Sequence, residues 1–393
     1  MKKAFHTLTT RGFIDPGFVR RKAEEALATP PMHITDHIAP LSEGGPHDYY
    51  SNGDYWWPDP TKPDGLPYIN RDGQTNPNNF DYHRTCLRSM RTAVSGLAMG
   101  YKLFGEEKYA VHAVRILKEF FLDEATYMAP HLTYTQAIPG RCSGRGIGII
   151  DTLHLSEVPA AIDALRTSPA MTGDIYRGLQ QWFADYLLWL NTHPYGISER
   201  DYVNNHAICW HVQAAAYARF TGNEAVLEAC RKRYKEVILP NQMREDGGFT
   251  NELQRTKPYG YSIFVLDNLA VLAWLLSDEN NDLWHFTLPD GRGVEKGLAF
   301  LLPYLQDKTS WFLPPDVEHY ESWPARASFM VLAGLVSGDE RWKKLYDSLP
   351  EESFDAEVRR NLGIRWPTLV AEWWKLQSKA GALDCGADED YCG

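Results

Sequence analysis

Residues 84–122 read "RTCLRSMRTAVSGLAMGYKLFGEEKYAVHAVRILKEFFL", and this stretch decides the fold. Apolar residues recur at spacings of three and four on both sides of Gly105, which is the pattern of amphipathic helices. A glycine followed by acidic residues suits the end of one helix and the beginning of the next. The stretch therefore predicts a hairpin of two helices.

The same pattern returns along the rest of the chain. The turns "FGEEKY", "TGNEAV" and "SGDERW", at 104–109, 221–226 and 337–342, are alike. Helical hairpins cannot bury their apolar faces alone, so they must stack on one another. Further helices are predicted within 1–28 and at 155–167, 173–192, 205–220, 223–238, 261–277, 294–306, 325–336, 339–347 and 366–378.

Stacked hairpins form either an open solenoid or a closed ring. Long loops between the hairpins favour a ring, so we expect an all-α (α/α) toroid or incomplete barrel of about five to seven hairpins, with its loops over one mouth. The 393 residues exceed the usual size of one domain, but a repetitive array accommodates residues 1–380 as a single domain. Residues 381–393 are acidic and Gly-rich, and we expect a mobile tail there.

Residues 40–82 differ from the helical regions. They are rich in Pro, Gly, Asn and Asp, which mark turns. A loop of this length is usually either functional or disordered. Its many Tyr and Trp residues disfavour disorder, so we expect an ordered loop that covers an active site.

The composition narrows the class of protein. Hydrophobic residues make up 44% and charged residues 23%, as in soluble globular proteins, and the net charge of −11 disfavours binding to nucleic acid. No run of about 18 apolar residues predicts a membrane helix, and the N-terminus lacks the apolar core of a secretion signal. A cytoplasmic location is expected, or a secreted or periplasmic one if a signal has been removed. The oligomeric state cannot be read from the sequence.

No metal site is expected. The six cysteines form no CxxC pair, and the histidines are dispersed along the chain. His206 and His211 are five residues apart, so they do not share a helix face as metal-binding histidines do.

The stretch "VNNHAICW" at 203–210 places three polar residues at the start of an apolar helix. Asn204 is the expected helix cap. One interpretation leaves Asn205 exposed and packs His206 against Trp210. The other directs an amide and an imidazole at an anion, at a helix end that itself favours negative charge.

The stretch "NELQRTKPYGYSIFVLDNLA" at 251–270 carries Arg255 in a loop and Tyr261 at a helix start. Tyr259 and Tyr261 are packing residues in one interpretation. In the other, Arg255 lies near the Tyr261 phenol and lowers its pKa, so that the phenol serves first as a base and then as an acid.

Two further segments carry candidate binding residues. Residues 131–152 contain several glycines but lack the motif of a phosphate loop, so nucleotide binding is rejected and a cavity-lining role is expected. Within 318–329, Trp323 and Arg326 either contact a substrate or are a core and a surface residue.

Four motifs in this order resemble the alginate lyases of toroidal fold. They are "NNHAICW", "ELQRTKPYGYSIFVLDNLA", "DYWWPDPTKPDGLPYINRDGQTNP" and "YTQAIPGRCSGRGIGIIDTLHL". The resemblance covers about residues 45–335 and is closer to polysaccharide lyase family thirty-eight, which includes alginate and glucuronan lyases. The spacing from Arg255 to Tyr261 is one residue shorter than expected for the classical bacterial enzymes, which leaves the substrate open.

The resemblance implies cleavage of a uronate polymer by β-elimination, without a metal or organic cofactor. Asn205, His206 and Arg255 would neutralise the substrate carboxylate, and Tyr261 would transfer the proton. His206 is the base if the C5 proton lies on the other face of the sugar. The substrate, an acidic polysaccharide, requires a positive cleft inside an acidic exterior. The residues expected to bind it are Tyr50, Trp57, Arg71, His83, Arg84, Tyr134, Gln136, Arg141, Arg145, Trp323 and Arg326.

Two alternatives remain at this stage. A glycoside hydrolase of the same fold would use two carboxylates, with candidates at Asp54, Asp59, Asp151, Glu252 and Glu321. A non-catalytic glycan-binding toroid would hold the saccharide on Trp56, Trp57 and Trp323 without cleaving it. Elimination alone creates a conjugated double bond, whose ultraviolet absorbance separates the lyase from both.

Overall fold

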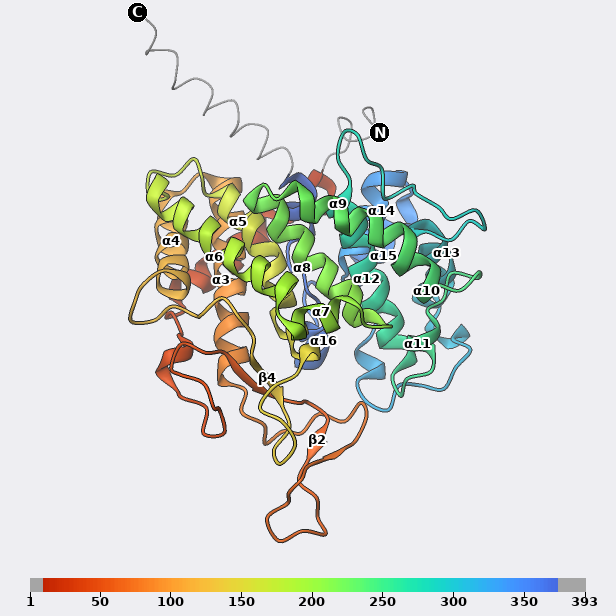
Figure 1. Cartoon of the computed structure of the whole chain (residues 1–393). Coiled ribbons are helices and arrows are strands. Elements are labelled where there is room, and N and C mark those ends of the chain that lie inside the picture. Colours follow the sequence, from red (N-terminus) through yellow and green to blue (C-terminus); the bar gives the residue numbers. More distant parts are fainter. Residues whose placement is uncertain (1–9, 374–393) are drawn as a thin grey trace, which may run out of the picture.

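The computed structural model describes residues 10–373. The expected tail at 381–393 lies outside these residues, and so does the end of the helix expected at 366–378, which is helical over 367–373. Helices dominate this part of the chain and pack side by side in a curved array, which confirms the all-α prediction (Figure 1).

Inner helices of the array pack in sequence, each against the next, and outer helices cover them. The inner helices are α3 (Tyr82–Phe104), α5 (Val158–Ala164), α8 (Asn205–Thr221), α12 (Pro258–Leu276) and α14 (Ser328–Ser337). The outer ones are α4 (Glu107–Phe121), α6 (Gly173–Thr192), α9 (Glu224–Arg233), α13 (Val294–Gln306) and α15 (Glu340–Ser348). Because α8 and α12 are buried on nearly all sides, their apolar residues are not confined to one stripe.

The glycine-acid turns form as predicted. Gly105, Gly222 and Gly338 end α3, α8 and α14 in the left-handed conformation, with φ of 67°, 69° and 65°. A side chain with a Cβ is disfavoured at such a φ, which explains the glycine in each turn. Each of these turns reverses the chain between an inner and an outer helix.

Two regions differ from the prediction. The helix predicted at 155–167 forms as α5 (Val158–Ala164), but a 3₁₀ helix that was not predicted, η3 (Gly146–Glu157), leads directly into it. An additional helix, α7 (Pro194–Arg200), follows α6, where the proline at the first position suits a helix start. The remaining short elements are η1 (Thr10–Phe13), α2 (Pro16–Ala28), η2 (Ile34–Asp36), η4 (Tyr234–Ile238), α10 (Leu239–Gln242), α11 (Thr250–Leu253), η5 (Lys308–Ser310), η6 (Tyr320–Ser322) and α16 (Ala356–Arg360).

The loop at 40–82 is tied to the array by short strands. Strand β1 (Tyr50–Asn52) pairs in parallel with β4 (Tyr134–Ala137), and β2 (Trp56–Trp57) pairs with β3 (Ile69–Asn70) as an antiparallel ribbon. Figure 1 shows this ribbon projecting beyond the lower end of the helices. The loop therefore stands at the mouth of the array.

Helix α12 is long and apolar enough to cross a membrane by length and composition alone. However, 94% of its most apolar window is buried inside the protein, as expected of a core helix. No other helix in residues 10–373 passes this test.

Candidate active site

A cavity of about 320 Å³ lies at the mouth of the array, beside the loop with β2 and β3. Its walls come from the beginnings of α3, α8 and α12 and from η3, together with that loop, β4 and α16. Helix beginnings carry unpaired backbone N–H groups, which favour anions. Five arginines and three aspartates line it: Arg84, Arg88, Arg145, Arg255, Arg360, Asp54, Asp72 and Asp151. This cavity, which we call the catalytic cavity, is thus locally positive in a chain with a net charge of −11, as expected.

The polar triplet at the start of α8 lies in the wall of the catalytic cavity. The Asn204 side chain caps the helix by accepting a hydrogen bond from the His206 backbone N–H, at 3.1 Å. Asn205 is only 2% exposed, and its backbone N–H donates to Oε1 of Glu252 at 2.9 Å. Asn205 is therefore held in place rather than solvated, and the exposed-Asn205 interpretation is wrong.

Glu199, on α7, holds the imidazole of His206. Its Oε1 lies 2.6 Å from Nδ1 of His206, and its side chain is fully buried. Burial raises the pKa of Glu199, although the contact with His206 opposes this change. When Glu199 is ionised, Nδ1–H of His206 donates to it, which leaves Nε2 for other partners.

Arg255 and Tyr261 meet at the other wall of the cavity. The Arg255 guanidinium donates to the Tyr261 hydroxyl at 3.1 Å and lies over its ring, and it pairs with Asp72 at 2.7 Å. Tyr261 is the only residue of α12 that is not fully buried, and its hydroxyl lies 2.8 Å from that of Tyr55. Asp316 accepts hydrogen bonds from backbone N–H groups at the start of α12, which fixes where Tyr261 emerges.

The pKa of Tyr261 differs from the sequence prediction. Burial raises it well above 10, and the neighbouring Tyr55 adds to this, while Arg255 opposes both. Arg255 lowers it less than expected because Asp72 neutralises much of the guanidinium charge. The phenol is therefore protonated at neutral pH in the structure without a ligand.

Arg84 and Arg360 brace the floor of the cavity. Arg84 is buried, pairs with Asp54, and lies 3.0 Å from Asp151. Arg360 lies 3.3 Å from the other oxygen of Asp54. Although burial opposes it, these two arginines lower the pKa of Asp54 to about 2. This network ties the loop at 40–82 to α3 and α16.

Gln136 and Arg145 line the cavity from the segment that the sequence singled out. Arg145 precedes η3, and its Nε donates to the Gln136 backbone carbonyl at 2.8 Å. Burial lowers the pKa of Arg145. Gln136 has a φ of 46°, which is rare for a residue other than glycine and directs its side chain toward Asp151, at 3.4 Å.

Of the predicted site residues, the structure gathers seven around the catalytic cavity. These are Asn205, His206, Arg255, Tyr261, Arg84, Gln136 and Arg145. They come from four segments that are far apart in the sequence, and folding brings them together at one cavity.

Four predicted binding residues do not line the catalytic cavity. Tyr50 and His83 are 1% and 2% exposed, and Nδ1 of His83 accepts a hydrogen bond from the Tyr50 backbone N–H at 3.0 Å. Trp323 is buried in the main core. Arg326 donates to the carbonyls of Tyr346 and Leu349, away from the catalytic cavity. Their side chains are occupied by packing or backbone bonds, so direct substrate contact in this cavity is not supported.

The other four lie around the loop without lining the cavity. Arg71 stacks on Trp57, with its guanidinium carbon 4.8 Å from the ring centroid. Arg141 lies in the same way over Trp56, which does line the cavity. Tyr134 packs into a small cluster with Tyr50. Three of them, Trp57, Arg71 and Arg141, thus lie on the loop and its neighbours outside the cavity lining.

The sequence reasoning missed the partners that orient the site. Tyr55, Asp72, Glu199 and Arg360 were not singled out, and Glu252 was considered only as a hydrolase carboxylate. Only Tyr55, within the aromatic loop, had a signal in the sequence. Within the described part of the chain, no group of three or more His, Cys, Asp or Glu side chains is arranged to hold a metal ion.

The chain is similar to known alginate lyases in both sequence and structure. The alginate lyase family model matches residues 34–311. An alginate lyase from Bacteroides ovatus is 33% identical, with a TM-score of 0.79 over 89% of this chain and 92% of that one. A variant of alginate lyase A1-III, complexed with tetrasaccharide, has the same fold at 15% identity and a TM-score of 0.58, over 90% of this chain and 93% of that one. No curated protein is matched. The protein is therefore a polysaccharide lyase and belongs to the alginate lyase family.

Proposed function

We propose that the protein cleaves alginate-type uronate polymers by β-elimination in the catalytic cavity. The main observation that supports this proposal is that His206, Tyr261 and Arg255 line the same locally positive cavity. The family membership and the alginate lyase at 33% identity support alginate as the substrate class.

The first requirement is to make the C5 proton acidic. When that proton leaves, negative charge moves into the neighbouring carboxylate. Arg255 and the Asn205 amide are proposed to bind this carboxylate at the beginning of α8, whose N–H groups favour negative charge. Donors aimed at developing charge commonly supply several kcal/mol of transition-state stabilisation, on the order of 3 kcal/mol for one donor.

The second requirement is proton transfer. The C5–H bond breaks and its electrons form the C4–C5 double bond, while the C4–O4 bond breaks and O4 takes up a proton. Tyr261, a neutral phenol in the free enzyme, is proposed to protonate O4. The departing chain thus ends in a hydroxyl, and the other fragment in a 4,5-unsaturated uronate.

The configuration at C5 decides which group takes the proton. In guluronate the C5 proton and O4 lie on opposite faces, so His206, oriented by Glu199, would take it. In mannuronate and glucuronate they lie on the same face, so Tyr261 would first have to lose its proton and would then return one to O4. Since burial raises the pKa of Tyr261, this second route is favoured by alkaline pH.

A hydrolase at this site has less support. Hydrolysis with inversion or retention needs one protonated carboxylic acid. Asp54 has a pKa of about 2 and is paired with two arginines, and Asp151 is paired with Arg84. Glu252 accepts from the Asn205 backbone and does not line the cavity.

The experiment is a panel of polymannuronate, polyguluronate and glucuronan, followed by ultraviolet absorbance and by sizing of the products. We expect absorbance of the unsaturated uronate to rise on at least one polymer, in step with the new chain ends. New reducing ends without that absorbance would indicate hydrolysis and contradict the proposal. An unchanged polymer would indicate a binding protein.

A second prediction concerns Glu199→Gln. The glutamine keeps the shape but not the charge that orients His206, and we expect kcat to fall about 10- to 100-fold, as for carboxylates that orient histidine in metal sites. Because burial raises the pKa of Glu199, the wild-type enzyme loses the ionised form as the pH falls through that raised value. Glutamine cannot be protonated in this way. The decrease in kcat that protonation of Glu199 causes at acidic pH should therefore be absent from the variant.

The control is Glu236→Gln, since Glu236 has a side chain that is 61% exposed on the outer surface. It should leave both the rate and the pH profile unchanged. An unaltered profile in Glu199→Gln would show that Glu199 only packs beneath His206.

A further inference from the structure

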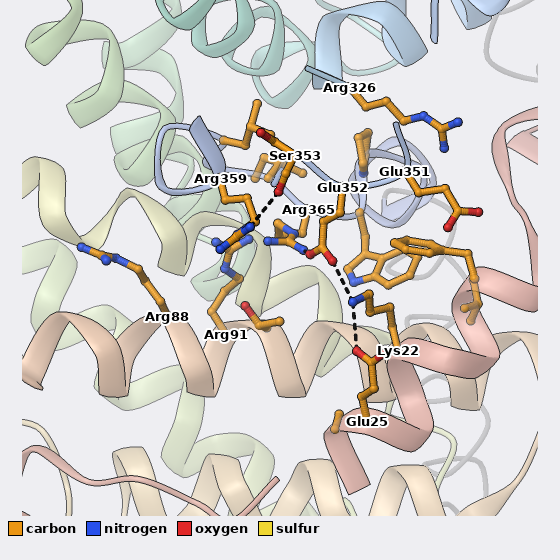
Figure 2. Close-up of a pocket in the computed structure, with 18 of the residues that line it drawn as sticks. Lys22, Glu25, Arg88, Arg91, Arg326, Glu351, Glu352, Ser353, Arg359 and Arg365 are labelled. Atoms are coloured by element: carbon orange, nitrogen blue, oxygen red, sulfur yellow. Dashed lines mark hydrogen bonds and ion pairs between the residues drawn. The ribbon is translucent and has the colours of Figure 1, made fainter. Parts of the chain in front are cut away.

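A second cavity, of about 490 Å³, lies between the beginning and the end of the helical array (Figure 2). Its walls come from α2, α3 and segments within 325–368, and we call it the seam cavity. Seven basic and four acidic residues line it. Its lining is thus positive in an acidic protein.

Two of these cations have no acidic partner among residues 10–373. Arg326 donates to the carbonyls of Tyr346 and Leu349, each at 3.0 Å. Arg359 donates to the carbonyls of Ser353 and Phe354, at 2.7 and 3.0 Å. Both guanidinium charges are therefore oriented but not neutralised.

Arg91 provides a buried, unsatisfied donor in the same wall. Its side chain is only 2% exposed and is held by Glu157 at 3.0 Å and by His154 at 2.9 Å, but its Nε has no partner in the described structure. Figure 2 shows Arg91, Arg359 and Arg365 directed into the same part of the seam cavity. Burial and the neighbouring Arg91 lower the pKa of Arg365 to about 10, even though Arg365 pairs with Glu352. A further anion among these cations would therefore be stabilised.

The seam cavity adjoins the catalytic cavity. Arg88 and Arg360 line both of them. His154, which bonds to Arg91, lines the catalytic one. A chain of basic side chains therefore leads from one cavity to the other.

Aromatic side chains also contribute to the seam cavity. Phe18, Tyr346 and Trp366 line it, and the Phe18 and Trp366 rings lie 5.5 Å apart. Aromatic faces beside guanidinium groups suit a ligand with both apolar C–H faces and carboxylates. A uronate sugar has both, whereas an inorganic oxyanion has only the charge.

We propose that the seam cavity is a second binding site for short oligouronates, the product class of the adjacent catalytic cavity. This proposal rests on the proposed function for its ligand. Its volume lies within the range of cavities that hold small ligands, about 300–1,000 Å³. The carboxylates would pair with Arg326 and Arg359, and an oxygen would accept from Nε of Arg91.

The test compares two variants at Thr92, an exposed residue of α3 that lines the seam cavity. Thr92→Glu adds a negative charge, and Thr92→Gln adds the same bulk without it. Each is combined with Tyr261→Phe, so that an alginate trisaccharide is not cleaved, and titrated by calorimetry. We expect two sites in Tyr261→Phe alone and with Thr92→Gln, and a second site at least about tenfold weaker with Thr92→Glu.

Several results would overturn the proposal. These are a single site in Tyr261→Phe, equal binding in both Thr92 variants, or equal binding of maltotriose or sodium sulfate at the second site. Wild-type turnover of polyuronate is measured separately, so failure of the second site and failure of the lyase assignment give different results. Thermal unfolding of each variant confirms that it is folded.

Discussion

Replacing Tyr261 with phenylalanine is expected to lower kcat by about 10³-fold or more, with a small change in substrate affinity. The variant loses one hydroxyl and keeps the ring beneath Arg255. No other side chain of α12 reaches the catalytic cavity apart from Phe264, which cannot transfer a proton. The rate of absorbance increase on polyuronate, measured under single-turnover conditions, reads the loss directly.

Tyr259→Phe is the matched control, because it removes a hydroxyl from the same helix two residues away. That hydroxyl donates to the Tyr304 carbonyl at 3.0 Å and does not line the catalytic cavity. The control should keep full activity and lose about 1 kcal/mol of stability. Near-full activity in Tyr261→Phe would remove the tyrosine from the mechanism and leave the O4 proton to another donor.

Replacing Arg255 with glutamine is expected to lower kcat/KM by about 10²- to 10³-fold, mostly through kcat. Glutamine still donates a hydrogen bond, but it cannot neutralise charge that develops as the C5 proton leaves. An interaction that strengthens in the transition state affects kcat more than KM. Steady-state kinetics over a range of polymer concentrations separates the two.

Arg244→Gln serves as the control for Arg255→Gln. Arg244 pairs with Asp246 at 2.6 Å on the surface, with 47% of its side chain exposed, so its loss should leave both constants unchanged. If Arg255→Gln raised KM alone, the guanidinium would bind the ground state and the transition state equally. The neutralising role would then belong to Asn205 and the helix end.

Much of the fold could be predicted because local signals and packing agree. Helices α6 and α13 begin and end where the periodicity predicted, at 173–192 and 294–306. Thr172 caps α6 through its side chain, so the helix has a local start signal. Over 146–157 the chain is tighter than an α-helix, and the apolar run there gives no periodicity that separates the two forms.

The site could be predicted only in part. The residues at helix starts, such as His206 and Tyr261, were singled out because polar side chains interrupt apolar stretches, and their roles followed from the family resemblance. Their partners were missed because they are distant in the sequence and come into contact only in the folded chain. Arg255 and Asp72, for example, are 183 residues apart in the sequence. His83 was placed in the site because the sequence does not show whether a polar side chain is used by the backbone, as it is here.

The anchoring of the loop at 40–82 has a consequence for the choice of chain length. Its base is fixed by the pairing of β1 with β4 and by the ion pairs of Asp54. Its tip, at 59–66, is bonded mainly within itself, as by the Asp59 backbone N–H to the Gly65 carbonyl at 2.9 Å. We therefore expect that insertions or deletions in the tip change access to one end of the catalytic cavity, and with it the balance between removal of terminal units and internal scission. The proton-transfer groups would keep their positions, so the product length would change without a change in the chemistry.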